Sequence, residues 1–159
     1  MIEITLEDKV HQIRTSWNDV TYSGYVEMLK NLDKTWMKRL SVYTGIDEDV
    51  LNKMTINQIC LFIETVGFME SLETVDAFTI GYESDIQISE LEYWKLEKAK
   101  QLLQASNGYI VGAEIVDLYT SDKDGNGGTN INDMPVTQAI GMVSFFLSNC
   151  KSSLTGSKD

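Results

Sequence analysis

The segment Met54-Thr55-Ile56-Asn57-Gln58 recurs 80 positions later as Met134-Pro135-Val136-Thr137-Gln138. Thr55 is a residue type that caps helices, and apolar residues at helical spacing follow both copies. We therefore expect one helix that starts at Thr55 and carries its apolar stripe to Met69. We expect a second helix over Val136–Ser148.

Two further pairs of segments resemble each other. Val20-Thr21-x-x-x-Tyr25-x-x-Met28 is similar to Ile88-Ser89-x-x-x-Tyr93-x-x-Leu96, at an offset of 68 residues. Leu40-Ser41-Val42-Tyr43-Thr44-Gly45 is similar to Val116-Asp117-Leu118-Tyr119-Thr120-Ser121, at an offset of 76. The three offsets grow along the chain, as a tandem duplication with insertions requires. Chance similarity between amphipathic helices is the alternative.

The expected fold class is α+β and mostly α-helical. A unit of about 50–60 residues buries little surface alone. We therefore expect two similar three-helix halves, at about residues 17–71 and 86–149, to share one core within a single domain of residues 1–150. Alternating apolar residues over Ile2–Leu6, continued by the extended pattern over Val10–Ile13, predict an N-terminal β-hairpin or a pair of short strands. A further short strand is expected at the junction, Phe78–Tyr82. Residues 151–159 are expected to be a disordered tail.

Capping residues predict where the other helices begin. Asp19 or Thr21 is expected to cap the first helix. Ser89 with Glu92 forms a potential capping box, and another helix is expected over Ile110–Thr120. The apolar stripe expected to follow Ser89 comprises Leu91, Trp94, Leu96 and Leu102.

The charge balance disfavours two classes of partner. The 159 residues include 24 acidic and 13 basic side chains, a formal net charge of −11. Nucleic acid and anionic membranes are therefore poor partners. The apolar run Ile140–Leu147 is shorter than the roughly 20 residues that span a membrane, and no secretory signal is visible. We expect a cytoplasmic protein in which Cys60 and Cys150 are buried thiols.

The sharpest local motif is the acidic loop Asp122–Asp133. Calcium loops of the EF-hand type place oxygen donors at positions 1, 3, 5, 7, 9 and 12, with glycine at 6. Counting from Asp122, position 6 is Gly127 and the loop resembles an EF-hand of the dockerin variety. The candidate calcium ligands are Asp122, Asp124, Asn126, the Gly128 carbonyl, Asn130 and Asp133.

Two features of this loop depart from the calcium pattern. Position 8 is Thr129, where an Ile or Val normally pairs two loops, and position 12 is Asp, which reaches an ion less easily than Glu. The first half offers no second loop of the right spacing. A Gly/Asn/Asp-rich turn lengthened by insertion is the alternative.

No motif in the sequence predicts catalysis. His11 is the only histidine, and no Ser, Cys or Asp lies at a spacing that would place its side chain beside the imidazole. Glu90, Glu92 and Glu97 alternate with Lys95, Lys98 and Lys100, which is typical of a solvated helix face rather than an acid–base pair. Trp17, Trp36 and Trp94 fit core positions, with a binding surface as the alternative. We expect a protein that is not an enzyme.

Residues 13–70 resemble a known family. The run Ile13-Arg14-Thr15-Ser16-Trp17-Asn18-Asp19-Val20-Thr21 with Tyr25, then Leu40–Asp47 and Phe68-Met69, is similar to small tail or baseplate-hub assembly proteins of tailed bacteriophages, such as T-even-type myoviruses. Tyr43 stands where that family has a Leu, and the C-terminal half matches only in its helix pattern.

The resemblance implies a virion structural or assembly protein of the tail, neck or baseplate. It would be made in the host cytoplasm, would contact other phage structural proteins and copies of itself, and could remain in the virion. A calcium-binding helix-loop-helix module centred on Asp122–Asp133 is the alternative.

Overall fold

The computed structural model describes residues 1–72, 75, 78, 82–86, 91–122 and 124–155. Helices predominate, and a two-stranded antiparallel sheet lies at the N-terminus, so the expected mostly helical α+β fold is confirmed. The elements are β1 (Ile2–Leu6), β2 (Lys9–Ile13), η1 (Trp17–Asp19), α1 (Tyr22–Lys30), α2 (Trp36–Thr44), α3 (Glu48–Leu51), α4 (Ile56–Val66), η2 (Gly67–Glu70), α5 (Tyr93–Ala105), α6 (Gly112–Thr120) and α7 (Val136–Thr155).

The N-terminal strands form a tight hairpin, as predicted. Ile2 lies opposite Ile13 and Leu6 opposite Lys9. The two connecting residues, Glu7 and Asp8, both have positive φ, at 46° and 62°. This backbone matches the twist of the paired strands. Ile13 is fully buried and anchors the hairpin in the core.

Local capping explains where the helices of the first half begin and end. The Thr21 hydroxyl accepts a hydrogen bond from the Gly24 N–H, so Thr21 rather than Asp19 caps α1. Thr55 caps α4 in a reciprocal capping box with Gln58. Gly45 ends α2 in the left-handed conformation, at φ 69°. These contacts satisfy backbone groups that a helix end leaves without partners.

Helix boundaries in the two halves follow the offsets found in the sequence. Helices α2 and α6 begin and end 76 residues apart, and α4 and α7 begin 80 residues apart. The hydroxyls of Thr44 and Thr120 both donate to the carbonyl four residues earlier, at 2.8 Å. The adjacent Tyr43 and Tyr119 are both buried. The duplication itself stays a prediction.

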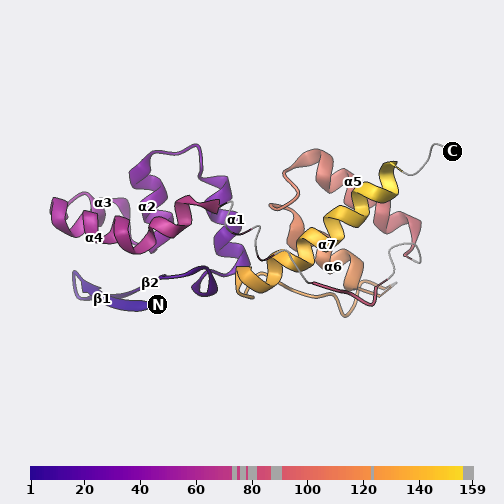
Figure 1. Ribbon diagram of the computed structural model, residues 1–159, viewed down its shortest axis with the longest axis horizontal. Helices are drawn as coiled ribbons and strands as arrows, with labels where there is room; N and C mark the ends of the chain where they lie inside the picture. The colour runs from indigo at the N-terminus through magenta and orange to yellow at the C-terminus, as the bar shows by residue number, and fades with distance from the viewer. Residues whose placement is uncertain (73–74, 76–77, 79–81, 87–90, 123, 156–159) are drawn as a thin grey trace.

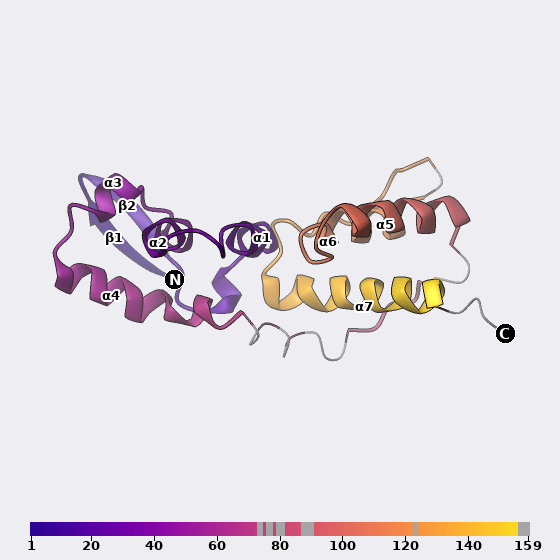
Figure 2. The ribbon, with the colours of Figure 1, turned by 90° about the horizontal axis from the view of Figure 1, so that it is seen from above.

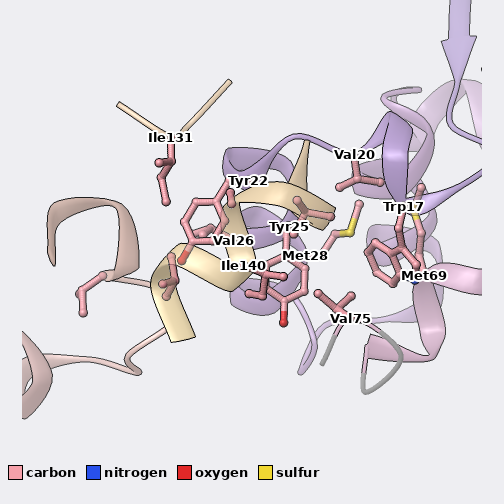
Figure 3. Packing of buried hydrophobic residues seen from close by; sticks show 14 of the residues in the cluster. Trp17, Val20, Tyr22, Tyr25, Val26, Met28, Met69, Val75, Ile131 and Ile140 are labelled. Carbon is pink, nitrogen blue, oxygen red and sulfur yellow. The ribbon is translucent and has the colours of Figure 1, made fainter. Parts of the chain in front are cut away.

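The two halves lie end to end along the long axis rather than face to face (Figures 1 and 2). They meet where the start of α7 packs on α1 and η1. The Val136 N–H donates to the Val20 carbonyl at 2.7 Å, and the Tyr22 N–H donates to the Met134 carbonyl at 2.9 Å. Buried residues from both halves form one cluster here (Figure 3). An isolated antiparallel bridge between Thr21 and Pro135, together with the packing of α7 on α1 and η1, therefore joins the halves in place of the strands we expected.

Three expected boundaries differ from the structure. Phe78 and Tyr82, the ends of the expected junction strand, are not in a strand, and residues 79–81 lie outside the described residues. Helix α5 begins at Tyr93 with Glu92 as its N-cap, so no capping box with Ser89 starts it; Ser89 itself lies outside the described residues. Helix α6 begins at Gly112 rather than at Ile110.

The C-terminal expectation is also corrected. Helix α7 continues past Ser148 to Thr155, so the first five residues of the expected tail are helical. Residues 156–159 lie outside the described residues. The polar composition of the tail concealed this extension, because a helix that is already formed adds residues at little cost.

Candidate functional site

The acidic loop between α6 and α7 is organised by its own backbone. Asp122 Oδ1 accepts hydrogen bonds from the N–H groups of Asp124, at 2.9 Å, and Asn126, at 2.8 Å. The Asp122 N–H donates to the Asn126 carbonyl. Gly125 and Gly127 have positive φ, at 78° and 75°, which glycine adopts without strain. This part of the loop is therefore an Asx-type turn.

The remaining candidate ligands also lie in local contacts. Asn130 Oδ1 accepts from the Asn132 N–H at 3.0 Å. Gly128 lies so close to the Asp117 carboxylate that a side chain there would overlap it. In the described part of the chain, no group of three or more His, Cys, Asp or Glu is arranged to hold a metal. The structure therefore does not bring Asp122, Asp124 and Asp133 together as a metal-binding group.

A hollow of about 270 Å³ beside the loop has acidic walls that the sequence did not indicate. Glu114 and Asp117 project from α6, and Asn130 and Asn132 come from the loop. The two carboxylates are three residues apart on one helix, a spacing that places them on one face. The spacing of the two carboxylates was visible in the sequence. Their proximity to Asn130 and Asn132 was not, because it depends on how the loop folds back onto α6.

Lys95 corrects the expectation of a fully solvated face on α5. Its side chain is only 3% exposed, and its Nζ donates to the Ser121 carbonyl at the C-terminal end of α6. A cation is favourable there because the helix dipole is negative at that end. The neighbouring Lys100–Glu97 pair, at 2.6 Å, fits the expected surface ion pair.

The possible nucleophiles divide between a buried and an exposed thiol. Cys150 is buried, as predicted, and its sulfur lies 2.8 Å from the Tyr119 hydroxyl. Burial raises the pKa of both groups, so both remain protonated at neutral pH. Cys60 was expected to be buried but is exposed. His11 is half-buried in β2, opposite Ile4.

The exposed side of α4 is apolar. Phe62 and Val66 are buried on one side of this helix. Ile56, Ile59, Cys60 and Ile63 follow helical spacing on another side, where Ile59 is half-buried and the other three are exposed. We call these four residues the α4 face. Periodicity in the sequence identifies an apolar stripe on this helix but not the elements that cover it, so it did not show that Ile63 would be exposed.

A second apolar surface lies at the first turn of α5. Tyr93 and Trp94 are both exposed, although Trp94 was expected in the helix's apolar stripe. The buried residues of α5 are instead Lys95 and Ala99. We call Tyr93 and Trp94 the α5 turn. Aromatic side chains on a protein surface are typical of contact sites.

An uncharged hollow of about 540 Å³ lies between the α5–α6 connection and α7. Its walls include Leu103, Asn107, Tyr109 and Leu147. The Ser144 hydroxyl also lines it and is buried with no hydrogen-bond partner among the described residues. None of the residues that line the hollow carries a charged side chain.

Comparison with other proteins does not assign a family. No protein-family model, curated protein or solved structure matches this chain. Within the described residues, no helix combines the length and apolar character needed to cross a membrane.

Proposed function

We propose that this protein is a non-enzymatic structural or assembly protein of a tailed bacteriophage, acting in the tail, neck or baseplate through protein–protein contacts. The observation that carries the proposal is the α4 face, where Ile56, Cys60 and Ile63 are exposed at helical spacing. Contiguous exposed apolar surface on a folded protein is typical of an interaction site. The resemblance of residues 13–70 supplies the class of protein.

The charge of the chain agrees with this role. A net charge of −11 favours the solubility of a chain with exposed apolar faces. The same charge disfavours nucleic acid as the partner. Synthesis and assembly would take place in the host cytoplasm.

A phage genetic experiment tests the proposal. A stop codon placed in this gene is expected to give particles that lack complete tails in negative-stain electron microscopy. Supplying the wild-type protein from a plasmid is expected to restore them. Supplying Ile56→Asp is expected to fail, whereas Leu61→Asp, a change at an exposed α4 residue outside the α4 face, is expected to restore tails. Complete, infectious particles without the protein would refute the role.

Calcium binding by the acidic loop is the second candidate. Its support is the helix-loop-helix arrangement of α6 and α7 with Gly127 at positive φ, together with the ligand spacing. Titration with calcium chloride in a calorimeter is expected to give heat that Asp122→Asn and Asp133→Asn abolish. The matched control Asp33→Asn, at an exposed surface carboxylate, is expected to retain it. An unchanged heat in the loop variants would remove the loop as the site.

A further inference from the structure

The α4 face has buried counterparts in the second half. Helices α4 and α7 begin at corresponding residues, Ile56 and Val136. At the same offset, the four residues of the α4 face correspond to Val136, Ala139, Ile140 and Val143, which are all 0% exposed. Ile56, by contrast, is 81% exposed. Three of the four positions are therefore buried in α7 but exposed in α4, and the fourth, Ile59, is half-buried.

Helix α1 helps to cover the corresponding face of α7. The start of α7 contacts both α1 and η1. Thr137 donates a hydrogen bond to the Asn18 side chain at 2.8 Å. Ile140 belongs to the same buried cluster as Tyr25 and Val26 of α1 (Figure 3). The internal junction is thus a contact between the last helix of one half and the first helix of the other.

The sequence counterparts of the covering residues are themselves exposed. Tyr25 and Val26 of α1 are buried at the junction, and at the offset of 68 they correspond to Tyr93 and Trp94. These aromatics are 71% and 45% exposed. Helix α5 begins later than an offset of 68 from the start of α1 would give, but both aromatic side chains still lie exposed in its first turn. The two helices that meet at the internal junction, α7 and α1, therefore correspond in sequence to the α4 face and the α5 turn. No described element covers the exposed side chains of either surface.

The two counterparts cannot meet within one chain. Helix α4 lies at one end of the long axis and α5 at the other (Figures 1 and 2). We propose that they meet between copies: the α4 face of one molecule packs on the α5 turn of the next, head to tail. Such a contact joins different surfaces, so it continues into a ring or an open filament rather than stopping at a dimer.

Charges at the edges of the two surfaces favour this contact. Lys53 lies just before α4, with its side chain 67% exposed and its Nζ 3.3 Å from Glu7 Oε1 in a surface ion pair. Glu92 lies just before α5 and directly precedes the α5 turn. Packing the two helix starts together brings these opposite charges near each other, which steers association and fixes orientation. The inference holds whether or not the protein belongs to a bacteriophage.

Matched variants at the two helix starts test the proposal. Ile56→Asp and Tyr93→Asp each place a carboxylate at the first residue of a helix, where the dipole favours it, so circular dichroism is expected to show an unchanged fold. Sedimentation velocity of the wild type is expected to show species larger than a dimer that grow with concentration. Each variant alone is expected to be monomeric, and Leu61→Asp is expected to associate like the wild type.

Mixing the variants distinguishes head-to-tail from symmetric association. Ile56→Asp retains its α5 turn and Tyr93→Asp retains its α4 face, so an equimolar mixture is expected to form a one-to-one heterodimer and nothing larger. A symmetric contact between two α4 faces would instead let Tyr93→Asp dimerise alone. That result, a wild type that stays monomeric up to about 1 mM, or a mixture that stays monomeric would each overturn the proposal.

Disulfide trapping gives an independent check on the same contact. Lys98→Cys places a thiol one turn beyond the α5 turn, and Cys60 already lies in the α4 face. Oxidation is expected to produce a ladder of linked species on a non-reducing gel, and adding Cys60→Ser is expected to abolish it. The wild type is expected to show no ladder and no linked dimer. A Cys60–Cys60 dimer in the wild type would overturn the head-to-tail arrangement.

Discussion

The contact between the halves should show itself as an energetic coupling between Tyr22 and Gly112. Tyr22 lies on α1, is fully buried, and donates its hydroxyl hydrogen to the Tyr109 carbonyl. Gly112 is the first residue of α6. A Cβ at Gly112 would stand 2.6 Å from Val143 Cγ1 and closer still to the Tyr22 hydroxyl. The glycine therefore allows α1, α6 and α7 to approach one another.

The cost of each single change follows from this geometry. Tyr22→Phe leaves the Tyr109 carbonyl without its donor, at about 1–2 kcal/mol. Gly112→Ala must move its neighbours by about 1 Å to reach ordinary carbon contact distances, and overpacking of this kind costs about 1–3 kcal/mol. A gain of up to about 1 kcal/mol in helix propensity offsets part of that cost. We expect each variant to lose about 1–2 kcal/mol of unfolding free energy.

The double variant should lose less than the sum of the two. Removing the Tyr22 hydroxyl also removes the closest obstacle to the new methyl group, which leaves only the contact with Val143. We therefore expect a favourable coupling of about 1 kcal/mol. Urea denaturation followed by tryptophan fluorescence and circular dichroism measures it. Additivity within about 0.3–0.5 kcal/mol would refute the close approach of α1 and α6.

Three other predictions follow from single sites. Gly67→Ala should stabilise the fold by about 0.4–1 kcal/mol, whereas Gly45→Ala should destabilise it by about 1 kcal/mol. Both sites have open space where a Cβ would lie, but only Gly45 has a positive φ. Thermal unfolding of the two variants is expected to show midpoint shifts of opposite sign. A backbone hydrogen bond from Thr15 and the N-terminal ammonium hold the pKa of Asp19 well below its usual range. The stabilisation that Asp19 contributes is therefore present above the unfolded pKa of about 4 and is lost as pH falls through the lower folded value. Urea titrations should show the difference in unfolding free energy between wild type and Asp19→Asn shrinking below about pH 4, and a difference that stays constant with pH would contradict this. Lys95→Met should lower the unfolding free energy by about 1–2 kcal/mol, because it removes the cation at the end of α6. Urea denaturation measures this loss against the control Lys98→Met, a change at an exposed lysine. An equally large loss in the control would show that the effect does not depend on the buried position of Lys95.

Features encoded by neighbouring residues were predictable from the sequence. The hairpin, the Thr21 and Thr55 caps and the end of α2 at Gly45 all depend on residues within one turn of each other. The side of each helix that becomes buried depends on elements distant in the sequence. Cys60 and Trp94 are apolar and were expected to be covered, but no described helix packs over them.

The candidate site shows the same division. Spacing alone identified the acidic loop, and it could not show that Asp122 uses its carboxylate to hold the turn. It also gave no sign that Lys95 would be buried, because its partner is a main-chain carbonyl, which carries no sequence signature. The correspondence between α4 and α7 was visible in the residues, whereas the difference in their coverage required the fold.

The pairing of Val20 with Val136 has a consequence for synthesis of the protein. Helix α1 buries its face against a helix whose sequence begins more than a hundred residues later. At about 5–20 residues per second, the ribosome needs on the order of 10 s to reach α7. During that interval Tyr22, Tyr25 and Val26 lack the surface that completes their packing. The nascent first half is therefore the species most exposed to aggregation, and the emergence of α7 ends that exposure.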